Sequence, residues 1–293
     1  MIRNYKPTGR MLSRKTQEMA CASARSFFVW ARRALRRYRL VEPLWIETLK
    51  PRRLVETVRE RELYTLDEVL AIARPIPGDG LKVQRDKAAV AFLFLSGMRS
   101  GAFVTLPVLA VDLKELTVKQ WPELGVATKN SKAATTYLLD IPELIEIVRV
   151  WDAYVRATLP PQAMWYARLK YDPGADMVTA DEATPPNPRR RGMMSKAVKD
   201  LCRSAGVLYR SPHKLRHGHA VYALKRARTI AEFKAVSQNL MHADLKITDG
   251  VYGILSGSDL QNTIAGLTSS HATDEEAVID LLESLLTKMK QGR

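Results

Sequence analysis

The stretch that decides the fold is Ser211-Pro212-His213-Lys214-Leu215-Arg216-His217. Ser211 is suited to cap a helix and Pro212 to occupy its first position, so a helix is expected to begin here. His213 and Arg216 stand three residues apart and would share one face of its first turns. The amino end of a helix carries free N–H groups and a partial positive charge. With a His and an Arg beside it, this end predicts a site for an anion, most simply a phosphate.

A phenol hydroxyl follows downstream at Tyr252, and it can act as a nucleophile. A phosphate clamp, imidazole rings and a phenol together indicate phosphoryl transfer through a covalent tyrosine intermediate. Each residue alone has an ordinary interpretation, because a lone Arg is usually solvated and a lone Tyr is usually a packed aromatic. Four of the five histidines of the chain fall in this region: His213, His217, His219 and His242.

Two of these histidines, His213 and His217, have the i, i+4 spacing of metal ligands. Lys214 stands where a zinc protease carries a Glu, so a metal site is disfavoured. We expect His217 to support the packing of the site. His219 is expected to be structural, since nothing pairs it with the phosphate.

The composition favours a globular, DNA-binding protein. The 293 residues suffice for two domains, and 46% of them are hydrophobic. The net charge of +15 favours a polyanionic partner, most often nucleic acid, and residues 1–62 hold 16 Lys and Arg against 6 Asp and Glu. Cys21 and Cys202 lie far apart without a metal spacing, which fits a reducing compartment. No apolar run approaches the ~20 residues that span a bilayer.

Residues 16–40 predict an amphipathic helix with an apolar stripe and an arginine stripe. Such a helix can pack on a small domain while its other face meets DNA phosphates. The same pattern can lie on a membrane surface, but Glu42 and Glu47 favour DNA. The arginines expected to bind DNA are Arg25, Arg32, Arg33, Arg36, Arg37 and Arg39.

A second domain is predicted from about residue 63. Thr65 and Glu68 form a capping box, and residues 85–97 predict a buried helix that leaves Arg99 at an exposed corner. A long loop is expected over 171–192. Strands are predicted at 116–118, 125–128 and 135–139, with Lys129 in a hairpin turn between the last two. Further helical segments are predicted at 103–109, 143–159, 195–205, 211–224, 232–240 and 274–289.

With these residues placed, the sequence resembles the tyrosine recombinases, the lambda-integrase family of DNA breaking-and-rejoining enzymes, over roughly residues 65–267. Residues 96–100 resemble the first-arginine box, Lys129 the hairpin lysine, and residues 213–217 the His-x-x-Arg box. Residues 236–242 with Tyr252 resemble the last His box and the nucleophile segment.

The resemblance implies an α+β fold, mainly α with a small antiparallel β-sheet. Residues 59–293 would form the DNA breaking-rejoining catalytic domain, including the helix 274–289. Residues 1–58 would form a short helical core-binding domain, in which the first helices of the family's domain are not found.

The resemblance also implies the chemistry. Two arginines would hold the non-bridging oxygens of the scissile phosphate while the tyrosine attacks phosphorus, giving a 3′-phosphotyrosine and a free 5′-hydroxyl. The histidines would assist the phenol proton and the lysine would protonate the leaving oxygen, without metal, cofactor or ATP. The implied catalytic residues are Arg99, Lys129, His213, Arg216, His242 and Tyr252.

Three positions depart from the family pattern. Ala102 stands where an acidic residue is usual, Lys214 where an Asp often follows the first His, and Met241 where a Gly usually precedes the last His. These are supporting positions, so the set of six implied catalytic residues stays whole.

The implied function is site-specific recombination, as in the integration of mobile elements. The implied partners are a double-stranded DNA recombination site and three further copies, giving a homotetramer on two sites without a membrane. Helix 274–289 would dock on a neighbouring protomer or on its own domain. The expected location is the prokaryotic cytoplasm, on the nucleoid. Two alternatives stay open: a type IB topoisomerase-like enzyme that relaxes DNA, and an integrase-derived DNA-binding regulator with weak catalysis.

Overall fold

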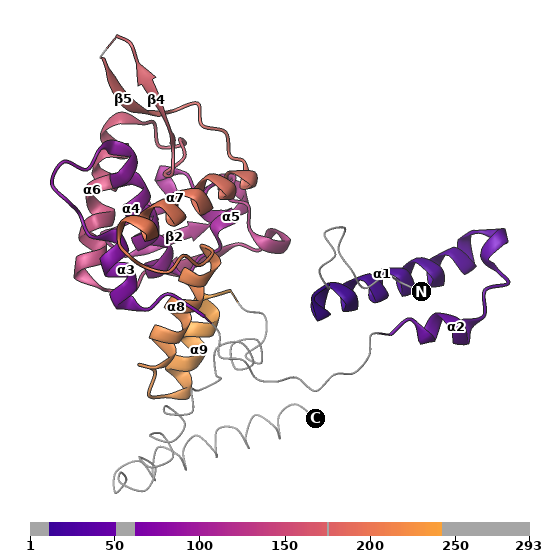
Figure 1. Cartoon of the computed structure of the whole chain (residues 1–293). Helices are drawn as coiled ribbons and strands as arrows, with labels where there is room; N and C mark the ends of the chain where they lie inside the picture. The colour runs from indigo at the N-terminus through magenta and orange to yellow at the C-terminus, as the bar shows by residue number, and fades with distance from the viewer. Residues whose placement is uncertain (1–11, 51–61, 175, 242–293) are drawn as a thin grey trace, which may run out of the picture. The chain divides into compact units, whose positions relative to one another are not determined.

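The computed structural model describes residues 12–50, 62–174 and 176–241. The chain divides into two compact units, Met1–Arg59 and Glu60–Arg293, and each is considered by itself (Figure 1).

Some predictions fall outside the described residues. They concern His242, Tyr252 and the helix expected at 274–289. Among the residues that are described, no helix is long and apolar enough to cross a membrane.

The first unit contains α1 (Arg14–Ala34), a 3-10 turn η1 (Arg36–Tyr38) and α2 (Pro43–Thr48). α1 ends at Leu35, where the backbone becomes extended with φ −119° and ψ 119°. The prediction of one helix reaching residue 40 is therefore wrong. The six arginines do not share one helical face, since half of them lie in or after η1.

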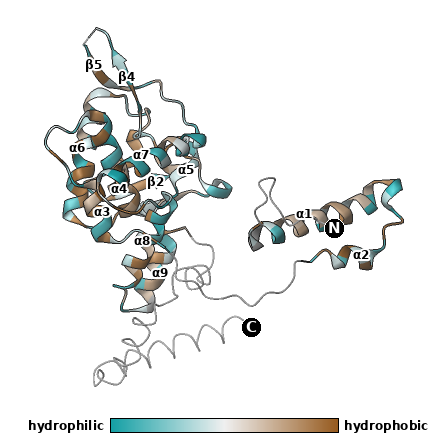
Figure 2. Ribbon diagram, viewed as in Figure 1, coloured by the Kyte–Doolittle hydropathy of each residue, from teal (hydrophilic) through white to brown (hydrophobic). Residues whose placement is uncertain are grey.

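Aromatic side chains hold the first unit together. Phe28 packs edge-on against Trp45 of α2 with ring centroids 5.0 Å apart, and Phe27 packs against Tyr38 at 5.8 Å. Of its described side chains, only Ala31 and Ile46 are buried hydrophobics. Figure 2 shows apolar and polar residues interleaved along α1 and α2. The unit therefore has a very small core of its own.

The second unit is built around α4 (Leu81–Ser96), which is buried from Arg85 to its end. α4 packs against α3, α6, α7 and α8 (Figure 1). The predicted capping box is confirmed, because the Thr65 hydroxyl accepts from the Glu68 N–H and the Glu68 carboxylate accepts from the Thr65 N–H. The surrounding helices are α3 (Leu66–Ala73), α5 (Ser100–Phe103), α6 (Pro142–Thr158), α7 (Arg191–Ser204), α8 (His213–Leu224) and α9 (Ile230–Asn239).

A three-stranded antiparallel sheet lies beside these helices. Its order is β1 (Val111–Asp112), β2 (Thr117–Gln120), β3 (Ala134–Tyr137), with Val118 opposite Thr136. The strand predicted at 125–128 is wrong, since that segment belongs to the long connection between β2 and β3. The helical turn predicted at 103–109 is also displaced, because α5 ends at Phe103 and the next 3-10 turn begins at Val108.

A two-stranded hairpin projects from the second unit (Figure 1). β4 (Arg168–Asp172) pairs antiparallel with β5 (Met177–Asp181), and Leu169 stands opposite Ala180. Sequence analysis predicted a loop from residue 171, and this part of the prediction is wrong. A 3-10 turn η5 (Pro188–Arg190) then leads directly into α7.

Candidate active site

The corner after α4 requires glycine. Gly97 has φ 59°, and its N–H donates to the Leu93 carbonyl at 3.1 Å. A Cβ on Gly97 would lie 2.5 Å from the imidazole of His219, so no larger residue fits without movement. The chain therefore turns sharply into α5 and leaves Arg99, its N-cap residue, half-buried at the corner.

Arg216 connects three elements. Its guanidinium is almost fully buried on α8 and donates to the Gly97 carbonyl at 2.6 Å and to the Leu240 carbonyl at 2.5 Å. These bonds attach the end of α4 and the end of α9 to α8. Because a guanidinium is planar with fixed donor directions, the two carbonyls orient it.

His213 lies in the first turn of α8, with its ring centroid 4.8 Å from that of His217. Although the side chain as a whole is exposed, desolvation is the largest cause of a lowered pKa of His213. The positive charges of Arg216, Arg99 and Lys214 lower that pKa further. The imidazole is therefore neutral at pH 7, in a positively charged setting that favours an anion.

The start of α8 differs from the prediction. The helix begins at His213, Pro212 occupies the N-cap position, and no side chain caps it. Ser211 contributes its backbone carbonyl, which accepts from the Lys214 N–H at 2.8 Å. The predicted capping role of the Ser211 hydroxyl is therefore wrong, and the amino end of α8 is left for another partner.

α9 carries the chain back to this corner. Its start is fixed by a capping box between Thr229 and Glu232 that sequence analysis did not identify. Its last residue, Asn239, accepts from the Tyr137 N–H at 2.7 Å and donates to the Tyr137 carbonyl at 2.9 Å, which ties α9 to the edge strand β3. Met241 then adopts φ 53°, and His242 follows it directly in the sequence.

The six predicted catalytic residues divide into three groups. Arg99, His213 and Arg216 come together, since both arginines act on the pKa of the imidazole. Lys129 is exposed in a 3-10 turn on the connection between β2 and β3. His242 and Tyr252 lie outside the described residues.

His219 is structural, as expected. Its side chain is 1% exposed and its Nδ1 lies 2.7 Å from the Phe94 carbonyl of α4. Burial lowers the pKa of His219 to about 4, so the ring is neutral at pH 7. His217 is also buried, where it packs edge-on against His213. Within the described part of the chain, no three His, Cys, Asp or Glu side chains are placed to hold a metal ion.

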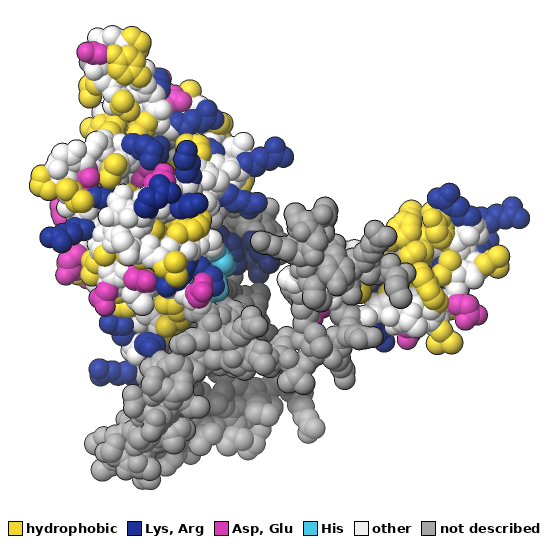
Figure 3. All heavy atoms as spheres, viewed as in Figure 1, with side chains coloured by type: hydrophobic (Ala, Val, Ile, Leu, Met, Phe, Trp, Pro, Cys, Tyr) yellow, Lys and Arg dark blue, Asp and Glu magenta, His cyan; other side chains and the backbone are white. Residues whose placement is uncertain are grey.

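Two arginines beside the site, Arg189 and Arg191, were not predicted from the sequence to belong to it. A cavity of about 400 Å³ is lined by Arg189 and Arg191 together with Ser100 and His213. Lys and Arg side chains gather on this face of the second unit, over α5 and α7 (Figure 3). The signal in the sequence is the run 189–191, which closes a Pro-rich segment and on its own predicts only the end of a loop.

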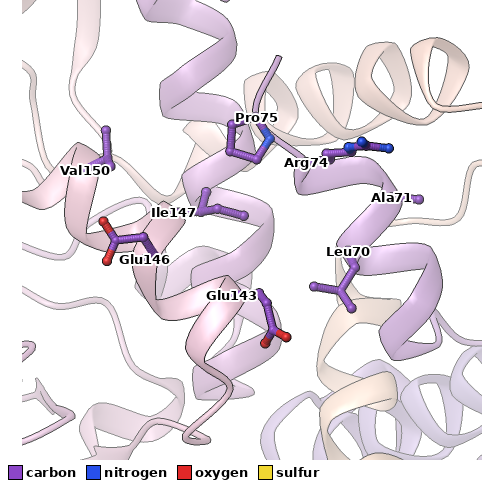
Figure 4. A pocket seen from close by; sticks show the side chains of 8 residues that line it. All are labelled: Leu70, Ala71, Arg74, Pro75, Glu143, Glu146, Ile147 and Val150. Atoms are coloured by element: carbon purple, nitrogen blue, oxygen red, sulfur yellow. The ribbon is translucent and has the colours of Figure 1, made fainter. Parts of the chain in front are cut away.

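A second hollow, of about 550 Å³, lies between α3 and α6 (Figure 4). It is lined by Leu70 of α3 and by Ile147 of α6, with Glu143 and Glu146 also on α6. Of the predicted catalytic residues that the structure describes, none lines this hollow. This hollow is therefore not part of the candidate active site.

Comparison with known proteins decides the family. Residues 65–255, more than half of the chain, match the phage integrase family. The chain belongs to the phage integrase family. The resemblance to tyrosine recombinases and the expected enzyme class, a DNA strand transferase of the tyrosine recombinase type, are thereby confirmed.

Curated relatives agree with this assignment. The chain is 25% identical over 242 residues to tyrosine recombinase XerC from Lactobacillus delbrueckii subsp. bulgaricus, covering 82% of this chain and 72% of the relative. It is 26% identical over 213 residues to tyrosine recombinase XerD from Xanthomonas campestris pv. campestris, covering 72% and 58%.

Solved structures confirm the predicted fold class. The XerA recombinase superposes with a TM-score of 0.51 at 18% identity, covering 88% of this chain and 78% of that one. The Tn1549 transposon integrase, solved with circular intermediate DNA, gives a TM-score of 0.52 at 15% identity, covering 87% and 81%.

Proposed function

We propose that this member of the phage integrase family cleaves and rejoins duplex DNA at a specific site through a 3′-phosphotyrosine at Tyr252. The observation that carries the proposal is the meeting of Arg99, His213 and Arg216 at one corner, beside the uncapped amino end of α8. Two guanidinium groups and a helix amino end suit a phosphodiester. They oppose the negative charge on the non-bridging oxygens of the phosphate in the transition state.

The proposed step is an in-line transfer. The phenol oxygen of Tyr252 forms a bond to phosphorus while the bond from phosphorus to the 5′-oxygen breaks. His213 accepts the phenol proton, which is consistent with a lowered pKa that keeps the ring neutral at pH 7. His242 donates to a phosphate oxygen, and Lys129 protonates the leaving 5′-oxygen. The phosphoester bond is conserved in the linkage, so rejoining needs neither ATP nor a metal ion.

Duplex DNA is the proposed partner. The Tn1549 integrase, whose fold this chain shares, is bound to circular intermediate DNA, and the charge of +15 favours a polyanion. We assign residues 1–58 to a short core-binding domain with Arg25, Arg32, Arg33, Arg36, Arg37 and Arg39 toward DNA phosphates.

Assembly and location belong to the same proposal. Residues 59–293 are assigned to the catalytic domain. We propose a homotetramer on two DNA sites that docks through residues 274–289, and a prokaryotic cytoplasmic location on the nucleoid. The bacterial sources of the curated relatives support that location.

A covalent-trapping assay tests the proposal. Nicked or phosphorothiolate duplexes that carry candidate sites are incubated with the protein and with Tyr252→Phe, and are resolved on a denaturing gel. The expected result is a slow-migrating protein–DNA band that the Tyr252→Phe variant does not form. Binding of the same duplexes without any such band would contradict the proposal and favour the DNA-binding regulator.

A further inference from the structure

The run Arg189-Arg190-Arg191 contains one structural arginine. Arg190 is 5% exposed, and its guanidinium donates to the Val104 carbonyl at 2.9 Å and to the Tyr166 carbonyl. Tyr166 is itself fixed, because its hydroxyl donates to the buried Asp86 at 2.8 Å. These contacts attach η5 to the core of the second unit. The residues on either side of Arg190 are therefore presented from a fixed turn.

The two flanking arginines are exposed and line the cavity of about 400 Å³. The turn is further defined by the Asn187 side chain, which accepts from the Arg189 N–H at 2.9 Å. Ser195 and Ser211 add hydroxyl groups to the lining, and none of the described residues that line the cavity is acidic. The cavity thus presents two permanent positive charges and hydroxyl donors without a compensating carboxylate.

Two helices begin at the same cavity. The first turn of α7 contributes Gly192 and the start of α8 contributes His213. Neither helix has a side-chain cap or an acidic residue in its first turn. Their amino ends add partial positive charge to that of the arginines. Forked guanidiniums and hydroxyls are the groups that bind a phosphodiester.

We propose that this cavity, through Arg189 and Arg191, binds the backbone phosphate next to the one that is cleaved, on the same DNA strand. The cavity shares His213 with the candidate active site and reaches Ser100, which follows Arg99. Because the residue after Arg99 lines the cavity, a phosphate neighbouring the one held at Arg99 would lie close to Arg189 and Arg191. This inference rests on the proposed function and adds a second clamp that sets the register of the strand.

The test compares two double variants in a Tyr252→Phe background, which removes the proposed nucleophile. Arg189→Gln/Arg191→Gln removes the cavity arginines. Arg74→Gln/Arg149→Gln is the matched control, with the same change of charge at two exposed arginines, one directly after α3 and one on α6, that do not line the cavity. Affinity for a short duplex is measured as a function of salt. Each lost phosphate contact is expected to reduce the slope of log K against log salt by about 0.9.

The same duplex is then prepared with single uncharged methylphosphonates at phosphates around the cleavage point. Because the cavity is proposed to hold one phosphate, the cavity variant should show a slope reduced by about 0.9. A methylphosphonate beside the cleaved phosphate should weaken binding by the parent protein but should not weaken binding by the cavity variant further. An unchanged slope, or equal effects of all methylphosphonates in both proteins, would overturn the inference. Because these are binding measurements, a failure of covalent trapping leaves them interpretable, and that failure would count only against the proposed cleavage.

Discussion

At the scale of single residues, the contact between Gly97 and His219 has the clearest energetic consequence. Gly97→Ala places a Cβ 2.5 Å from the buried imidazole at a backbone φ of 59°. Left-handed backbone and overpacking together should lower the free energy of unfolding by about 2–4 kcal/mol. Urea denaturation measures this loss. Gly101→Ala is the control, because a Cβ there meets no atom within 4 Å; equal losses in both variants would refute the explanation.

The buried ring of His219 also predicts a pH dependence. The unfolded chain binds a proton at His219 near pH 6.5, whereas the folded chain does so only near its pKa of about 4. Stability is therefore unaffected at pH 7 and falls as the pH drops from about 6.5 to 4. The loss can reach about 3 kcal/mol, because a tenfold difference in proton affinity corresponds to about 1.4 kcal/mol. Unfolding free energies at pH 7 and pH 5 should differ more for the parent than for His219→Gln. If the unfolding free energy changed equally with pH in the parent and in His219→Gln, His219 would not be the group responsible.

Met241 occupies a backbone conformation that favours glycine, with φ 53°. Met241→Gly should therefore raise the free energy of unfolding by about 0.5–1 kcal/mol, although glycine also gains freedom in the unfolded chain. Met193→Gly, inside α7, is the control and should lower it by about 1 kcal/mol. Thermal unfolding of both variants measures these changes. A loss of stability in Met241→Gly would show that the contacts of the Met side chain stabilise the protein by more than its positive φ costs.

At the scale of elements, α9 and β3 are joined by one side chain. Asn239→Ala removes two hydrogen bonds to the Tyr137 backbone and should lower the free energy of unfolding by about 1–2 kcal/mol. Hydrogen exchange gives a specific test, because the Tyr137 amide should lose protection. Gln238→Ala, at an exposed neighbouring position of α9, should leave that amide protected. Protection that persists in Asn239→Ala would show that the two elements are held by other contacts.

The long helices could be predicted from the sequence because their signals are local. The capping box before α3 and the apolar run of α4 each specify an element without reference to the rest of the chain. Segment 125–128 looks like a strand, yet the Thr128 N–H bonds to the Val126 carbonyl at 2.9 Å within its own turn. In the β4–β5 hairpin only Ala180 is buried, so no alternation of apolar and polar residues marks its strands.

The residues of the candidate site were likewise only partly predictable from the sequence. Arg216 and His213 were predictable because their spacing on one helix places both at its amino end. Arg189 and Arg191 were not, since nothing in three consecutive arginines marks the middle one as buried against Tyr166. Met241 was recognised as a departure from the family pattern, but its positive φ required the backbone.

At the scale of the whole molecule, the second unit contains the whole main hydrophobic core, from Tyr64 to Leu215. The first unit adds positive charge with little core of its own. The proposed function assigns DNA binding to the first unit and the chemistry at the phosphate to the second. His242 and Tyr252 lie outside the described residues, so the identity of the nucleophile has to be established by experiment.

The most direct measurement is to identify the residue that is joined to DNA. The trapped complex is digested with nuclease and trypsin, and the nucleotide-linked peptide is sequenced by mass spectrometry. We expect a phosphotyrosine that links Tyr252, on the peptide that begins after Lys246, to the 3′ end of the cleaved strand. A linkage at another residue, or through the 5′ end, would contradict this expectation.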